Sequence, residues 1–382
     1  MKITDVEGII LQSPQQYTNP AGSEEATGVA YCFLIKVSTD EGITGWSDVE
    51  TAPHVAASLI DSPATGSGMI EGIKSLVIGE DPFETERLWD KIYRGTIYYG
   101  RRGVAMQVLS GFDIACYDII GKATDRPLYK ILGGAYRDEV RAYASTLFRP
   151  KPDDIKRACE YYMERGFTAI KFGWGIFGQD RKTDIALVKA AREAVGEDVD
   201  LLVDAGWKQN RSAYDAIELL RQLEPYHIYW LEDFLHPECY EGYRKVKEAG
   251  VKTRIAAGEQ EATGWGFCRL IQNGGIDVAQ PDISRCGGFT QIKRIIWEAE
   301  VAGIDVCPHA WLTDLLTAAS LHVNAVLPRS LFLEYNVSSS PMLRDIIRNP
   351  VEMDHNGKMK VPQNPGLGIL MDEKAVNRYR IN

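Results

Sequence analysis

The sequence predicts an α/β protein built on a parallel barrel of the (β/α)₈ type, a modified TIM barrel, with a smaller α+β domain before it. Short apolar strands alternate with helical segments from residue 140 to residue 336. Most of these strands end on a residue that can do chemistry, and such residues recur after 33, 28, 27, 23, 27 and 25 residues. Each interval fits one strand, one helix and two loops, the repeat of a parallel barrel. The first 130 residues lack this alternation.

Residues 1–130 predict a capping domain in which strands precede helices. The stretches 1–12 and 30–49 are rich in apolar and β-branched residues, and the Asp-Glu-Gly at 40–42 marks a hairpin turn. Between residues 52 and 132, apolar residues recur at spacings of three and four, which indicates helices. We therefore expect an antiparallel meander followed by a helical group.

Residues 131–355 predict the barrel domain, and we expect the tail, 356–382, to return to the capping domain. The eight predicted strands are 140–146, 169–173, 201–206, 228–233, 254–259, 277–282, 304–309 and 331–336. Seven helical segments lie between them. Repeated strand–helix alternation of this kind requires parallel pairing and right-handed crossovers.

Bulk composition narrows the class of protein. The formal charge is −10 without a basic block, which argues against a nucleic-acid partner. No apolar run approaches 18 residues and the first ten residues do not resemble a signal peptide, so we expect neither a membrane span nor secretion. The seven cysteines are scattered without Cys-x-x-Cys spacing, which favours free thiols in the cytoplasm.

Three carboxylates end three successive strands: Asp204, Glu232 and Glu259. Neighbouring strands lie about 5 Å apart, so these side chains can converge on one ion. All-oxygen ligation favours Mg²⁺, with Mn²⁺ as the alternative. Each acid taken alone could instead cap a helix or lie in a solvated loop. Their succession favours the metal site.

Four further residues complete a candidate catalytic set. Asp282 and His309 end the next two strands, and an adjacent carboxylate would orient the imidazole and favour its protonated form. Lys171 could bind a substrate carboxylate or act as a base if its pKa is depressed. Glu334 could stay protonated and donate to an anionic substrate. The alternatives are a buried histidine satisfied by an ordinary acid, a lysine that only reaches solvent, and a salt-bridged acid.

At these residues the chain resembles the enolase superfamily and, within it, the mandelate racemase subgroup. The resemblance covers nearly the whole length: DEGITGWSD at 40–48, SGFDIACYDIIGKATDRPLYKILGG at 110–134, the strand-end residues, and PGLGI at 365–369. It implies one Mg²⁺ on Asp204, Glu232 and Glu259. It further implies an Asp282–His309 general acid–base pair and Glu334 as a donor to an enediolate.

The departures from this family bear on the reaction. Lys171 matches the first lysine of the Lys-x-Lys motif, but the second, usually the opposing base, is Gly173. Gly206 stands where the family often has asparagine, no lysine ends the sixth strand, and no histidine follows Asp204. A two-base racemase is thereby disfavoured, as are the muconate-lactonising, dipeptide-epimerising and galactonate-dehydratase patterns.

The resemblance implies an acid-sugar dehydratase, a hydro-lyase acting on an aldonate or aldarate to give a 2-keto-3-deoxy acid. Three alternatives stay open: a racemase or epimerase, a lactone cycloisomerase, and a non-catalytic sugar-acid binding protein. Capping-domain residues would contact the far end of a small carboxylate substrate, and a homo-oligomer is expected. Arg285 could meet a second carboxylate and so signal an aldarate. The expected substrate contacts are Tyr17, His54, Arg101, Arg285 and Trp311.

Overall fold

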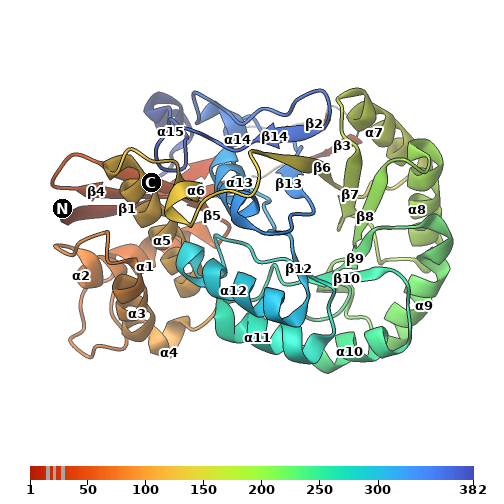
Figure 1. Ribbon diagram of the computed structural model, residues 1–382, viewed down its shortest axis with the longest axis horizontal. Coiled ribbons are helices and arrows are strands. Elements are labelled where there is room, and N and C mark those ends of the chain that lie inside the picture. The colour runs from red at the N-terminus through yellow and green to blue at the C-terminus, as the bar shows by residue number, and fades with distance from the viewer. Residues whose placement is uncertain (14–17, 20–22, 27–30) are drawn as a thin grey trace.

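The computed structural model describes residues 1–13, 18–19, 23–26 and 31–382. A capping domain lies at one end and a barrel of strands and outer helices at the other, with both chain termini on the capping side (Figure 1). The predicted fold class, a modified barrel behind an α+β cap, is confirmed.

The capping domain begins with an antiparallel sheet of β1 (Ile3–Gln12), β4 (Tyr31–Thr39) and β5 (Thr44–Val49), in that order. The predicted turn at residues 40–42 joins β4 to β5. In the chain between β1 and β4, two short strands, β2 and β3, form a separate antiparallel pair. The helices that follow are α1 (Pro53–Asp61), α2 (Ile73–Val77), α3 (Thr85–Gly95), α4 (Ile97–Gly100), α5 (Val104–Ala123) and α6 (Leu128–Ile131). The bounds of β2 and β3 are Thr18–Asn19 and Ser23–Ala26.

Helix α5 is the core helix of the capping domain. It packs against β4 and β5 and also against α12 (Gly288–Ala302) of the barrel. Within the described part of the chain, α5 alone has the length and apolar composition of a membrane span, but 89% of that window is buried inside the protein. Such burial on several sides explains why its apolar residues are not confined to one stripe.

The barrel sheet contains the eight predicted strands, and every neighbouring pair among these eight is parallel. The order runs from β12 back to β6, and β13 lies beside β6. No ladder between β12 and β13 is present in the described residues. The strands are β6 (Glu139–Leu147), β7 (Ala169–Gly173), β8 (Asp200–Asp204), β9 (Trp230–Glu232), β10 (Arg254–Ala257), β11 (Val278–Ala279), β12 (Asp305–Val306) and β13 (Leu333–Asn336).

Strands β11 and β12 are much shorter than the six residues predicted for each. Pro281 and Pro308 follow them, and proline has no N–H to donate to a ladder. The chain nevertheless stays extended, since Asp282 and His309 form an isolated parallel bridge. The two residues therefore lie side by side as expected, outside the regular strands.

All seven predicted barrel helices form, and they surround the strands (Figure 1). Helix α8 begins before its apolar pattern does, because Asp180 caps it by accepting from Thr183 N. Ser212 caps α9 and forms a capping box with Asp215. The remaining bounds are α7 (Pro152–Glu164), α8 (Arg181–Val195), α9 (Ala213–Leu223), α10 (Tyr240–Glu248), α11 (Thr263–Gly274) and α13 (Asp314–Val326). Two 3₁₀ turns, η1 (Trp207–Gln209) and η2 (Glu224–Tyr226), lie between them.

The tail contacts both parts of the protein. After α14 (Met342–Asp345), β14 (Lys358–Lys360) pairs antiparallel with β6. The last helix, α15 (Glu373–Tyr379), leads to Ile381, whose N–H donates to the Ile10 carbonyl of β1 at 3.0 Å. The tail therefore fastens the first strand of the cap to the first strand of the barrel.

Buried polar contacts also fix the cap on the barrel. Asp48, at the end of β5, accepts hydrogen bonds from Thr313 N at 2.9 Å and Thr313 Oγ1 at 2.7 Å. On α5, Asp113 accepts from Thr290 N at 3.0 Å and from its hydroxyl at 2.6 Å. Because these groups are buried, the bonds set the position of β5, and hence of the residues after it, over the barrel mouth.

Candidate active site

A cavity of about 270 Å³ lies at the carboxyl ends of the barrel strands. Residues from β6, β7, β8, the loops after β10, β11 and β12, and β13 line it, and Glu50 of the capping domain closes one side. The lining residues are Glu50, Ser145, Thr146, Leu147, Lys171, Gly173, Trp174, Asp204, Glu259, Gln260, Arg285, His309, Trp311 and Glu334. The parallel sheet thus converges its strand ends on one pocket.

The three predicted metal ligands converge. Asp204, Glu232 and Glu259 are all buried, and each offers an oxygen within 4.8 Å of the other two. Register explains this, because Asp204 and Glu232 are paired neighbours on β8 and β9. Asp204 is held by Gly206 N, which donates to its Oδ1 at 2.9 Å. These residues could hold a metal ion.

The charge balance of this cluster also fits a cation. Burial, and then the negative charge of Glu232, raise the pKa of Asp204 well above its usual range. Burial likewise raises the pKa of Glu232, although Lys171 opposes that rise. Buried carboxylates that repel one another destabilise a fold unless a positive charge compensates them. A divalent cation would supply that charge, and carboxylate oxygens are suitable ligands for one.

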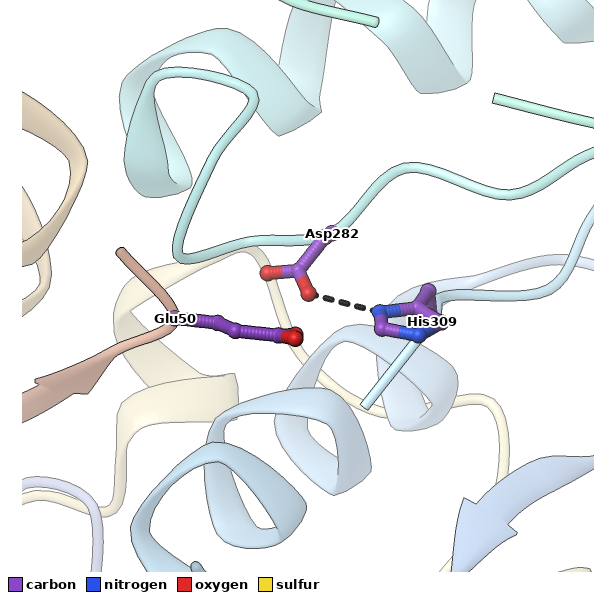
Figure 2. Close-up of side chains that lie close together, drawn as sticks. All are labelled: Glu50, Asp282 and His309. Atoms are coloured by element: carbon purple, nitrogen blue, oxygen red, sulfur yellow. Dashed lines mark hydrogen bonds and ion pairs between the residues drawn. The ribbon is translucent and has the colours of Figure 1, made fainter. Parts of the chain in front are cut away.

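His309 and Asp282 form the predicted pair (Figure 2). His309 Nδ1 lies 2.7 Å from Asp282 Oδ2, and the other Asp282 oxygen accepts from Ser284 N at 2.7 Å and Ser284 Oγ at 2.6 Å. An ionised carboxylate can only accept, so Nδ1 carries the proton and donates. The ring is thereby oriented with Nε2 towards the carboxylates of the pocket.

The pocket environment favours a protonated imidazole. His309 Nε2 lies 3.0 Å from Glu259 Oε2 and 3.9 Å from Glu334 Oε2. Burial acts to lower the pKa of His309, but these two carboxylates and the bond to Asp282 outweigh it and raise the pKa well above its usual range. Conversely, burial acts to raise the pKa of Glu259, but His309 and Arg285 lower it.

Lys171 is a charged donor in this structure, contrary to its expected alternative role as a base. Its Nζ lies 2.8 Å from Glu232 Oε1 and 2.9 Å from Glu334 Oε1. Burial acts to lower the pKa of Lys171, but the two carboxylates raise it well above the usual range. A lysine held in this way keeps its proton.

The contacts of Glu334 favour the ionised form over the expected protonated one. Burial acts to raise its pKa, but Lys171 and His309 lower it to about 2. Its oxygens accept from Ser145 Oγ at 2.7 Å and Ala310 N at 2.8 Å. Donors on both oxygens favour the ionised form, so Glu334 acts here as an acceptor that orients Lys171.

Of the predicted substrate contacts, Arg285 and Trp311 line the cavity, whereas the structure places two others elsewhere. His54 faces solvent on the first turn of α1, because the chain turns into that helix directly after Glu50. Arg101 follows α4 and lines a separate groove against α11. Tyr17 lies outside the described residues.

Sequence models of two domains match this chain: "Mandelate racemase / muconate lactonizing enzyme, N-terminal domain" over residues 10–133, and "Enolase C-terminal domain-like" over residues 154–375. The second match covers more than half of the chain and contains all seven strand-end residues. The chain belongs to the enolase superfamily, in the mandelate racemase subgroup.

Individual relatives of this enolase-superfamily enzyme carry more than one activity in their names. It is 30% identical to D-galactarolactone cycloisomerase of Agrobacterium fabrum, over 100% of this chain and 99% of that protein. It is 32% identical to arabinonate dehydratase of Saccharolobus solfataricus, over 81% of each chain. The crystal structure of the 3,6-anhydro-D-galactonate cycloisomerase from Zobellia galactanivorans is similar throughout, with a TM-score of 0.88, 27% identity and full coverage of both chains.

Two acids of this enolase-superfamily site were not among the predicted site residues, although residues 50–54 were expected to lie over the barrel mouth. Glu50 lies next to the Asp282–His309 pair, with one oxygen within 4.8 Å of a ligand atom of each (Figure 2). Glu50 also forms an ion pair with Arg285. Asp233 is buried beside Glu232, at a left-handed φ of 45°. Both follow strands directly, so the end of β5 marks Glu50 in the same way as the barrel strand ends mark the acids of the cluster.

Proposed function

We propose that this enzyme is a Mg²⁺-dependent acid-sugar dehydratase that removes the α-proton of a carboxylate substrate and then eliminates the β-hydroxyl. The observation that carries the proposal is the His309–Asp282 pair facing the same cavity as three buried carboxylates and Lys171. Relatives named as dehydratases of aldonates support it.

Asp204, Glu232 and Glu259 would hold the Mg²⁺. When bound, the ion supplies Lewis-acid stabilisation of the negative charge that develops on the substrate carboxylate. Lys171 contributes to the same end, because its charged Nζ borders the cavity and can donate to a carboxylate oxygen. Glu334 keeps that ammonium group in place.

His309 would carry the proton. A cation held by Glu259 would offset the negative charge that retains a proton on Nε2 and so favour the neutral ring. Nε2 of the neutral ring accepts the α-proton while Nδ1 stays bonded to Asp282, and the electron pair of the C–H bond moves into the enediolate. The imidazolium then returns the proton to the departing β-hydroxyl, which leaves as water. The resulting enol tautomerises to a 2-keto-3-deoxy acid. One histidine suffices for both transfers, which agrees with Gly173 in place of a second base.

The experiment is a screen of aldonates and aldarates with Mg²⁺ for 2-keto acid formation, with solvent-deuterium exchange at the α-carbon as a second readout. We expect His309→Asn to lower turnover by about 10²- to 10⁴-fold, the usual contribution of a general acid–base group. Mg²⁺ binding, followed by calorimetry, should persist in that variant. Unchanged turnover in His309→Asn would exclude the mechanism.

A second candidate is a lactone cycloisomerase that uses the same α-proton transfer. It is favoured by the two cycloisomerases whose similarity extends over the whole of this chain. Mass spectrometry distinguishes the two reactions, because a dehydratase product is lighter by one water and a cycloisomerase product has the mass of its substrate. α-Deuterium incorporation without any product would instead favour an epimerase.

A further inference from the structure

One ion pair joins the capping domain to the catalytic pair. Arg285, three residues after Asp282, is 8% exposed and borders the cavity. Its Nη2 donates to Glu50 Oε2, its Nη1 to the Glu259 carbonyl at 3.2 Å, and its Nε lies 3.6 Å from Asp282 Oδ2. Nη1 also lies 3.7 Å from Glu259 Oε1. All three nitrogens of the guanidinium therefore face protein oxygens.

The surrounding charge is strongly negative. Six carboxylates line the cavity or contact its lining: Glu50, Asp204, Glu232, Glu259, Asp282 and Glu334. Among described side chains, the positive groups facing them are Lys171, Arg285 and, when protonated, His309. A divalent cation at the acidic cluster would reduce this excess but leave the site negative whether or not His309 is protonated. One substrate carboxylate is accommodated at the Lys171 end, and a second would have no cation to meet.

The sequence limits which side chains outside the described residues could bring a positive charge to the pocket. Residues 14–30 contain Glu24 and Glu25 and neither lysine, arginine nor histidine, so this segment cannot supply a cation whatever its position. Lys208 is a cation on a loop after a barrel strand whose side chain is not among those described. Its substitution therefore belongs to the test.

We infer that the far end of the pocket is built for an uncharged polyhydroxyl chain, so that the substrate is an aldonate or another monocarboxylate and not an aldarate. Glu50 is the specificity-determining residue: its carboxylate neutralises Arg285, accepts hydrogen bonds from distal hydroxyl groups, and repels a second carboxylate. This inference rests on the proposed function and reverses the expectation that Arg285 signals an aldarate.

The other groups of the pocket suit such a chain. Gln260 donates from Nε2 to Glu259 at 2.9 Å, which leaves its carbonyl oxygen as an acceptor for hydroxyl groups. Trp174 and Trp311 line the same cavity and can cover the C–H faces of a sugar chain. Neutral hydroxyl groups exchange bonds with water for bonds with these groups, whereas a buried second carboxylate would lose its hydration without a counter-ion.

The test compares aldonates with the aldarates of the same configuration, using the Mg²⁺-loaded full-length protein. Suitable pairs are galactonate and galactarate, gluconate and glucarate, xylonate and xylarate, and arabinonate and arabinarate. For the pair that turns over fastest, we expect kcat/KM for the aldonate to exceed that for the aldarate by at least about 100-fold. Repulsion between two like charges about 4 Å apart in a partly buried site is large enough to cause such a difference. This comparison needs no variant.

Glu50→Gln then isolates the residue. The kcat/KM for the aldonate divided by that for the aldarate should fall at least about tenfold, chiefly through a lower KM for the aldarate. The reason is that the repelling charge is gone and Arg285 is released. A merely structural Glu50 would change kcat for both substrates and leave the ratio unaltered, which would overturn the assignment. Glu84→Gln, an exposed acid of the cap outside the cavity, is the matched control and should keep the ratio.

The outcomes separate the two proposals. Absence of keto-acid formation, cycloisomerisation and α-deuterium exchange with every compound would refute the proposed function. An aldarate turned over at least as fast as its aldonate partner would leave that function standing and overturn only this inference. An aldarate preference that disappears in Lys208→Met would identify Lys208 as the missing counter-ion and would overturn it as well.

Discussion

At the residue scale, the chemistry of the site depends on which charges each buried group meets. Glu334 and Lys171 illustrate this, because each contacts a partner that fixes its proton: Glu334 is ionised and Lys171 is charged. One oxygen of Glu232, Oε1, accepts a hydrogen bond from Lys171 Nζ, and the other, Oε2, accepts one from Trp230 Nε1 at 2.9 Å. Its carboxylate is thus oriented within the acidic cluster by donors on both sides.

This orientation leads to a prediction for the metal site. Glu232→Gln should weaken Mg²⁺ binding by at least about tenfold, the lower end of the loss seen even when second-sphere partners of a metal are removed. An amide keeps the shape of the side chain but removes the negative charge that attracts the cation. Isothermal titration with Mg²⁺ measures the change, and an unaltered affinity would show that Glu232 is not a ligand.

At the element scale, strand register decides what can stand next to the acidic cluster. Gly173 ends β7 and is the paired neighbour of Asp204 on β8. A Cβ built at Gly173 would lie 2.9 Å from Asp204 Cβ and 3.0 Å from its Oδ2. Such distances are too short for non-bonded carbon atoms. The absence of the family's second lysine therefore accompanies a close approach between this backbone and Asp204, a proposed metal ligand.

Gly173→Ala should accordingly displace Asp204 and weaken Mg²⁺ binding on the order of tenfold, as outer-sphere changes at metal sites do. The measurement is again calorimetry with Mg²⁺. Gly274→Ala, at the end of α11, would meet only the side chains of Leu270 and Ile276, at 3.1 and 3.7 Å, and should leave the affinity unchanged. Equal affinities for Gly173→Ala and the unsubstituted protein would show that the methyl group is accommodated without moving the ligand.

The contact between β5 and the segment before α13 leads to a pH-dependent prediction. Burial raises the pKa of Asp48 to about 7, although the bonds from Thr313 oppose the rise. A raised pKa in the folded state stabilises the fold below pH 3.8, and this stability is lost as the pH rises towards 7. Asp48→Asn cannot ionise and therefore avoids the loss.

We therefore expect the unfolding free energy of Asp48→Asn, relative to the unsubstituted protein, to increase by about 2–4 kcal/mol between pH 4 and pH 8. Denaturant unfolding at several pH values measures this difference. The exposed Asp198, changed to asparagine, is the control and should show a nearly constant difference. A flat profile for Asp48→Asn would mean that this carboxyl ionises freely in the fold.

At the scale of the whole molecule, His322 connects three segments that are far apart in the chain. On α13, its Nδ1 accepts from Tyr129 N of α6 at 3.2 Å, and its Nε2 lies 3.2 Å from the Leu367 carbonyl of the tail. Only the neutral ring with a proton on Nε2 satisfies both contacts. Burial lowers the pKa of His322 to about 4, although the carbonyl of Leu367 opposes this.

A lowered histidine pKa gives stability that is present above pH 6.5 and is lost as the pH falls through the folded value of about 4. The advantage of the unsubstituted protein over His322→Gln should shrink by up to about 3 kcal/mol over that window. Comparing the two proteins cancels the contributions of all other titrating groups. An advantage that grows on acidification would show that the folded protein binds a proton at this ring.

The sequence by itself determined the barrel, its eight strands and the convergence of Asp204, Glu232, Glu259, Asp282 and His309. This was possible because parallel strands bring their carboxyl ends to one face, so position along the chain becomes position in space. The shortening of β11 and β12 also has a local cause, in Pro281 and Pro308.

Only the tertiary structure decided the protonation of Lys171 and Glu334, the engagement of Arg285 by Glu50, and the positions of His54 and Arg101 away from the cavity. The reason is physical: a pKa or an ion pair depends on charges and burial contributed by residues far away in the chain. Glu50 and Arg285 are separated by 235 residues, and no local pattern relates them. The seating of the cap on the barrel brings them together.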